Sequence, residues 1–110
     1  MFEVSNNEIF LTRGDTGLFV LDIKNQDGEL YTRDEGDVVV FTVKASPRDM
    51  LALIEKNIGA DGKVTINPAD TARLNYGTYF YDIQLTRAED DSVCTIIPPT
   101  PFNLTEEVTW

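Results

Sequence analysis

NPADTARLNYGTYFYDIQL, residues Asn67–Leu85, is the stretch that decides the fold of this chain of 110 residues. Asn67 suits a helix N-cap, Pro68 suits the first helical position, and Asp70 stands where a side chain can return to the cap. The stretch therefore predicts one short helical turn near residues 68–74. A strand follows directly, which is the order of elements at a corner of an antiparallel β-sandwich.

The start of that strand makes the prediction more specific. Gly77 releases the chain from the turn, and Tyr79 lies just inside the strand. A tyrosine at this place can return its hydroxyl to backbone groups near Asp70, as in the tyrosine corner of Ig-like sandwiches. The D-T-A run before it resembles the same corner of immunoglobulin-type domains. Tyr81 stands where antibody-type domains carry their second cysteine, so we expect Ig-like architecture without the cysteine pair.

Alternating apolar residues and turn signals extend the β pattern along the chain. Strands are predicted at Ile9–Thr12, Thr16–Lys24, Val38–Ala45, Met50–Ile58, Lys63–Ile66, 78–86, Val93–Ile97 and 102–109. Met50–Ile58 could also form a helical turn, but Lys63–Ile66 reads like its hairpin partner across a turn at Gly59–Gly62. Asn25–Gly28 reads as a further turn, and Pro98, Pro99 and Pro101 should interrupt the strand ladder. Seven or eight short strands predict a single all-β domain over residues 1–110.

The charge of the chain limits its partners. Nine basic and nineteen acidic residues give a net charge of −10, which repels phosphate backbones and anionic bilayers. We therefore expect no nucleic-acid and no membrane partner. The N-terminus lacks the pattern of a signal peptide, and no apolar stretch approaches the roughly 20 residues that span a bilayer. The chain is expected to be made and folded in a cytoplasm.

Residues that support common enzyme chemistry are scarce. There is no histidine and only one cysteine, Cys94, which excludes histidine-based triads and the usual zinc sites. Acidic clusters occur at Asp34–Asp37 and Glu89–Asp91, and they read as solvated turns, with a calcium site or a catalytic acid pair as alternatives. The tripeptide Arg13–Asp15 spells R-G-D, the integrin-binding tripeptide, but such a short match occurs by chance, and glycine and aspartate suit a tight turn between two strands. We expect no catalytic residue, no cofactor and no metal site.

Three aromatic residues are candidates for an assembly surface. Phe80 lies on the opposite face of its strand from Tyr79 and Tyr81, so that strand can bury one face in the core and the other against a neighbour. Phe102 lies in the C-terminal strand, and Trp110 is the last residue. A tryptophan at the end of the chain is costly to leave in water. These residues predict protein–protein docking, with a homo-oligomer as one form of it.

Several runs of the sequence resemble a family of small proteins from tailed phages and prophages of Gram-positive gut bacteria. The runs are IFLTRGDTGLFVLDI, DGELY, GDVVVFTVK, DTARLNYGTYFYDIQL and TIIPPTPFNLTEEVT, and they cover most of the chain. The most specific are R-G-D-T at Arg13–Thr16 and G-x-Y-x-Y-D-I-Q-L at Gly77–Leu85. The family is similar to the N-terminal domain of phage baseplate upper proteins, an Ig-like sandwich that attaches a receptor-binding arm to the virion.

Two hypotheses of function follow. The resemblance implies a non-enzymatic virion component of the tail, baseplate or fibre adaptor, with other phage structural proteins as partners, and it offers no catalytic residues. The alternative is a β-sandwich that binds carbohydrate or a host surface through exposed aromatic residues and loop carboxylates, with or without calcium. A carboxylate hydrolase would require two acids that converge in a groove.

Overall fold

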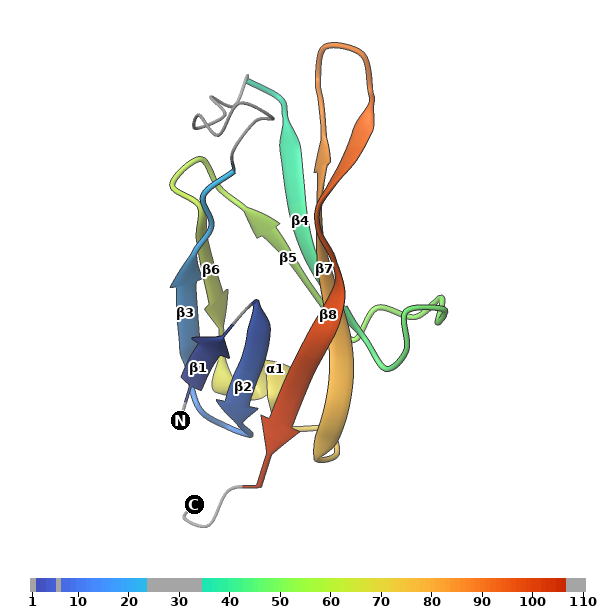
Figure 1. The fold of residues 1–110 in the computed structure, drawn as a ribbon. Helices are drawn as coiled ribbons and strands as arrows, with labels where there is room; N and C mark the ends of the chain where they lie inside the picture. The colour runs from blue at the N-terminus through green and yellow to red at the C-terminus, as the bar shows by residue number, and fades with distance from the viewer. Residues whose placement is uncertain (1, 6, 24–34, 107–110) are drawn as a thin grey trace.

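The structure is a computed structural model that describes residues 2–5, 7–23 and 35–106. The predicted turn at Asn25–Gly28 and Trp110 lie outside these residues. The described part contains eight strands and one short helix (Figure 1). They are β1 (Phe2–Ser5), β2 (Glu8–Thr12), β3 (Gly17–Val20), β4 (Val38–Lys44), β5 (Ile54–Ile58), β6 (Lys63–Ile66), α1 (Pro68–Thr71), β7 (Gly77–Thr86) and β8 (Val93–Thr105).

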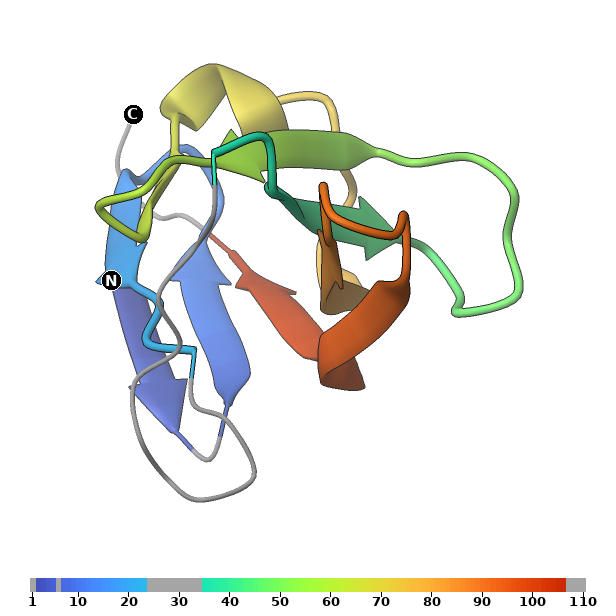
Figure 2. The ribbon, with the colours of Figure 1, turned by 90° about the horizontal axis from the view of Figure 1, so that it is seen from above.

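The strands form a curled six-stranded sheet in the order β1-β2-β8-β7-β4-β5 and a two-stranded sheet of β3 and β6 (Figure 2). The prediction of an all-β fold is confirmed. The prediction that all pairing is antiparallel is wrong at one place, because β2 and β8 run parallel. Their register sets Ile9 opposite Phe102 and Leu11 opposite Leu104. An alternating apolar pattern has the same period in either direction, so the sequence alone does not fix the sense of pairing.

The core lies between the two sheets. Alternate residues of β4 and β7 are buried, as their period of two requires. Buried side chains of β6 join them, so the two-stranded sheet covers one face of the larger one. A row of aromatic contacts crosses the core: Phe2 stacks on Phe19, Phe19 meets the edge of Phe41, and Phe41 packs on Tyr81.

The predicted hairpin between Met50–Ile58 and Lys63–Ile66 is wrong. Strand β5 begins only at Ile54 and pairs with β4, whereas β6 pairs with β3. The turn Gly59–Gly62 therefore carries the chain from one sheet to the other. Both strands bury alternate apolar residues, and such a pattern fits any neighbour with a free edge, so the pattern could not name the partner.

The C-terminal residues form one strand where two were predicted. Strand β8 continues through its prolines because its register against β7 shifts there. Tyr81 lies opposite Thr100 and Ile83 opposite Ile97, which leaves Pro98 and Pro99 together opposite a single residue of β7. This is the two-against-one arrangement of a β-bulge, where a missing N–H donor costs little.

Gly62 should be essential for the crossing between the sheets. Its φ is +75°, and an added Cβ would lie 2.5 Å from the carbonyl oxygen of Leu21. That carbonyl cannot move freely, because the Leu21 N–H donates to the Gly62 carbonyl at 2.8 Å. We expect Gly62→Ala to lower the free energy of unfolding by about 2 kcal/mol or more, measured by urea unfolding.

Gly59→Ala, in the same turn, is the matched control for Gly62→Ala. Its added Cβ would meet only the Asp61 carboxylate, at 3.4 Å. We expect a change of less than about 1 kcal/mol in either direction. Equal effects of the two substitutions would show that the turn does not depend on the backbone conformation of Gly62.

Candidate functional site

Several side-chain hydrogen bonds hold the corner between α1 and β7. The Asn67 N–H donates to the Asp70 carboxylate at 2.7 Å, which caps the helical turn. The Tyr79 hydroxyl donates at 2.7 Å to the carbonyl of Asn75, four residues before it. The sequence predicted a partner near Asp70 instead. Gly77 lies between them with a φ of +145°, a conformation that side chains disfavour.

The R-G-D-T turn packs against this corner. The Arg13 guanidinium lies over the Tyr76 ring, 4.4 Å from its centre, and donates to the Tyr76 hydroxyl at 3.0 Å and to the Leu74 carbonyl at 3.3 Å. The Gly14 N–H donates at 3.1 Å to the hydroxyl of Thr71, which is completely buried. The R-G-D tripeptide thus joins the first strands to the corner before β7.

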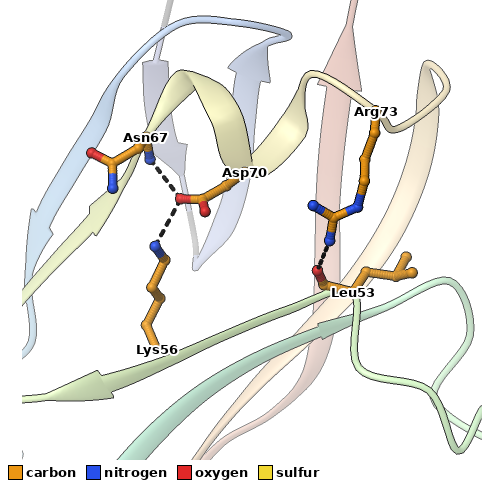
Figure 3. A network of polar contacts seen from close by, with 5 residues as sticks. All are labelled: Leu53, Lys56, Asn67, Asp70 and Arg73. Carbon is orange, nitrogen blue, oxygen red and sulfur yellow. Dashed lines mark hydrogen bonds and ion pairs between the residues drawn. The ribbon is translucent and has the colours of Figure 1, made fainter.

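A polar network fixes the corner to strand β5 (Figure 3). The Lys56 ammonium lies 2.8 Å from the Asp70 carboxylate, and the Arg73 guanidinium donates at 2.9 Å to the carbonyl of Leu53. Burial alone would raise the pKa of Asp70. The hydrogen bonds from Lys56 and from the Asn67 N–H, with the charges of Lys56 and Arg73, outweigh burial and lower that pKa below its usual value.

Two carboxylates of the acidic clusters, Asp37 and Asp90, accept hydrogen bonds from backbone N–H groups in the described part of the chain. Asp37 is buried and accepts the Ala88 N–H at 2.8 Å, and Asp90 accepts the Ser92 N–H at 3.0 Å. Both carboxylates therefore shape turns. Among residues 2–5, 7–23 and 35–106, no three side chains of the metal-binding types converge. Asp34 lies outside the described residues.

The predicted interface residues lie in very different surroundings. Phe80 is half-buried on the outer face of the large sheet, opposite Lys44 of β4 and Pro101 of β8. Phe102 is completely buried in the core. The register of β8 against β2 and β7 turns its ring inward, so Phe102 does not lie at the surface where the sequence placed it. Trp110, as stated, is not described.

Sequence analysis missed a pair of exposed apolar residues in the loop between β4 and β5, residues 45–53. Met50 is 96% exposed and Leu51 is 71% exposed. The loop projects from the sheet (Figures 1 and 2) but is held at its base. The Leu53 N–H donates to the Val43 carbonyl at 2.8 Å, and the Asp49 N–H donates to the Ser46 carbonyl at 3.0 Å. Pro47 could have indicated that the chain leaves the sheet before Met50 and Leu51. The apolar residues of Met50–Ile58 suggested a strand instead.

An open cleft of about 620 Å³ lies between the end of β3, the β1–β2 turn and the first half of β8; we call it the β3–β8 cleft. Its walls are mainly apolar and include Val4, Ile9, Phe19, Val20, Ile96 and Ile97. Asn7, Asp22, Tyr81 and Thr95 supply its polar groups. The Tyr81 hydroxyl donates to the Asn7 carbonyl, and burial raises the pKa of Tyr81 to about 12.

In comparisons with known proteins, no protein-family profile matches this chain, and no curated protein is significantly similar to it in sequence. None of the helices in the described residues has the length and apolar character needed to cross a bilayer.

The bond between Gly14 and Thr71 should contribute measurably to stability. Thr71→Val keeps the shape of the side chain but removes the acceptor, so the Gly14 N–H loses its partner. We expect the free energy of unfolding to fall by about 1–3 kcal/mol. Thr65→Val is the same chemical change at an exposed position of β6 and should change stability by less than about 0.5 kcal/mol. Equal effects would exclude a stabilising role for the hydroxyl of Thr71.

The lowered pKa of Asp70 predicts how stability depends on pH. A folded-state pKa below the unfolded value of about 3.9 means that the stabilisation is complete above that value and is lost as pH falls through the folded pKa. Asp70→Asn should cost about 1 kcal/mol at pH 7, because the ion pair is partly exposed and the cap is retained only in part. The difference from the wild type should disappear near pH 2.

Urea unfolding of both proteins between pH 2 and pH 7 measures this difference. Glu55→Gln removes one carboxylate from an exposed position of β5 and so reports the effect of net charge alone. A difference between wild type and Asp70→Asn that stays constant down to pH 2 would show that ionisation of Asp70 is not its source.

Proposed function

We propose that this chain is an Ig-like β-sandwich. Three observations support the proposal beyond the all-β content. Strand β2, near the start of the chain, pairs in parallel with the last strand, β8. Strands β3 and β6 pair with each other and cover the larger sheet. The Tyr79 hydroxyl closes the corner that leads into β7, as in the tyrosine corner of such domains.

We infer that its function is structural: a non-enzymatic virion component that docks to other phage structural proteins in the tail, the baseplate or a fibre adaptor. The resemblance of the sequence runs supports this origin. The two most specific runs, Arg13–Thr16 and Gly77–Leu85, are used to join and extend the strands, because Arg13 and Gly14 bind the corner before β7. These runs therefore support the fold, and contact with partners is left to other surfaces.

The observation that carries the docking function is the exposure of Met50 and Leu51. Two adjacent large apolar side chains on a projecting loop lose about 1.5–3 kcal/mol each by staying in water when they could be buried. The described structure gives them no internal partner, whereas the loop around them is held by backbone hydrogen bonds at Ser46 and Val43. A loop of this kind is suited to insertion into a partner.

The alternative of a carbohydrate-binding module has less support. Tyr76 is 40% exposed, but Arg13 covers one face of its ring. Stacking of a sugar would compete with this contact. The β3–β8 cleft has few polar groups to recognise hydroxyls, and recognition of sugars needs such groups to be paired. We therefore keep docking as the proposed function.

The test is to find the chain in purified phage particles and to change the loop. We expect mass spectrometry to detect the chain in intact particles. The double variant Met50→Asp and Leu51→Asp should reduce its incorporation at least about tenfold, because loss of about 1.4 kcal/mol already has this effect. Leu18→Asp and Val93→Asp make the same change at exposed positions outside the loop, 54% and 60% exposed, and should be incorporated normally. Particles that contain full tails but none of this chain would contradict the proposal.

A further inference from the structure

We propose that Met50 is an oxidation site that regulates docking: a peroxide converts its thioether to a sulfoxide, and the loop between β4 and β5 then loses the apolar character through which it docks. The oxidation follows from the position of Met50 in the structure alone. Its regulatory effect rests on the docking role of the loop proposed above.

The side chain of Met50 is open to solvent on a loop that projects from the sheet (Figures 1 and 2). It is 96% exposed, more than any other large apolar side chain in residues 2–5, 7–23 and 35–106. Methionine in folded proteins usually fills gaps between core side chains, and such packing keeps a reagent away from the sulfur. At Met50 a small oxidant reaches the sulfur without any opening of the fold.

The oxidation needs a peroxide as its only co-reactant. The Met50 sulfur gives an electron pair to one oxygen of hydrogen peroxide, so an S–O bond forms as the O–O bond breaks. The proton of the transferred oxygen passes to the departing hydroxide, which leaves as water. The sulfur is thereby oxidised by two electrons and the peroxide is reduced. The sulfoxide is polar and accepts hydrogen bonds, so its burial against an apolar partner surface is unfavourable.

Oxidation changes the loop and leaves the fold intact. The bonds that hold the loop join backbone groups: the Leu53 N–H donates to the Val43 carbonyl at 2.8 Å, and the Asp49 N–H donates to the Ser46 carbonyl at 3.0 Å. The side chain of Met50 supplies none of these atoms, and the pairing of β4 with β5 does not include it. We therefore expect the melting temperature of the oxidised chain to lie within about 3 °C of that of the untreated chain.

Cys94 of β8 is the other oxidisable sulfur in the described residues, and it lies away from the loop. Leu85 pairs with Cys94 on one side and with Val39 on the other, so Cys94 lies level with the start of β4. The loop leaves β4 at its other end, after Lys44. A thiol also reacts with peroxides. Oxidation of Cys94 leaves the loop unchanged, and Cys94→Ser separates the two reactions.

The first test measures where and how fast the full chain is oxidised. Peptide mass mapping after treatment with hydrogen peroxide should find one added oxygen at Met50. The rate in the folded chain should lie within about twofold of the rate in the chain unfolded in urea, because the fold covers so little of the side chain. Protection of Met50 by more than about tenfold in the folded chain would overturn the proposal.

The second test measures docking. Untreated or oxidised full chain is added to extracts of cells infected with a phage that lacks the gene, and mass spectrometry measures how much enters the particles. We expect at least about fivefold less of the oxidised chain to enter. Methionine sulfoxide reductases with a dithiol should restore entry, since the oxygen leaves as water while the dithiol becomes a disulfide. Cys94→Ser should respond to peroxide as the wild type does.

Met50→Leu is the matched control. Leucine keeps an apolar side chain at this position but has no sulfur, so peroxide should leave its entry into particles at its own untreated level. An oxidised wild type that enters particles as well as the untreated chain overturns the regulation, as does an equal loss of entry in peroxide-treated Met50→Leu. If Met50→Asp combined with Leu51→Asp enters particles normally, the docking role fails and the regulation fails with it, whereas oxidation of Met50, measured on the free chain, stands.

Discussion

Phe41 of β4 packs between the two sheets and contacts aromatic side chains of both. It is completely buried, meets Phe19 of the smaller sheet at 5.8 Å between ring centres and Tyr81 of the larger sheet at 5.3 Å. Aromatic side chains bury more apolar area than any other type, and the edge and tilted contacts add to that burial. The position of Tyr81 in turn places its hydroxyl on the Asn7 carbonyl and so sets the β1–β2 turn. The wall of the β3–β8 cleft therefore depends on packing in the core.

A second constraint joins two segments that are far apart in the sequence. The R-G-D-T turn and the corner before β7 are separated by 57 residues between Gly14 and Thr71, yet three hydrogen bonds and one cation–π contact join them. Thr71 is completely buried, so its bond to Gly14 cannot be replaced by water without cost. A short tripeptide that is well known as a receptor motif is used here as a contact within the fold. The role of such a short motif depends on the residues that it contacts in the folded protein.

The most specific runs of the sequence stabilise the fold. For this reason they do not indicate which surface contacts a partner. The turn Arg13–Thr16 is bonded to Thr71, Leu74 and Tyr76, in the corner that leads into the strand Gly77–Leu85. The loop with Met50 and Leu51 has no such internal task, since its side chains lie in water. Sites of interaction commonly lie on loops held by a rigid scaffold, and the loop with Met50 and Leu51 is exposed and held at its base in this way.

The sequence by itself determined the local structure: the all-β content, the helical turn after Asn67, the alternating burial of β4 and β7, and the turn at Arg13–Thr16. These features depend on neighbouring residues and on a period of two, which a sequence contains. The tertiary structure alone decided the parallel pairing of β2 with β8, the passage of the chain from β5 to β6 between sheets, the burial of Phe102, and the union of β3 and β8 residues in one cleft. Periodicity shows which residues face inward, but not which strand lies beside which, because any strand with a matching apolar face can fill the same place.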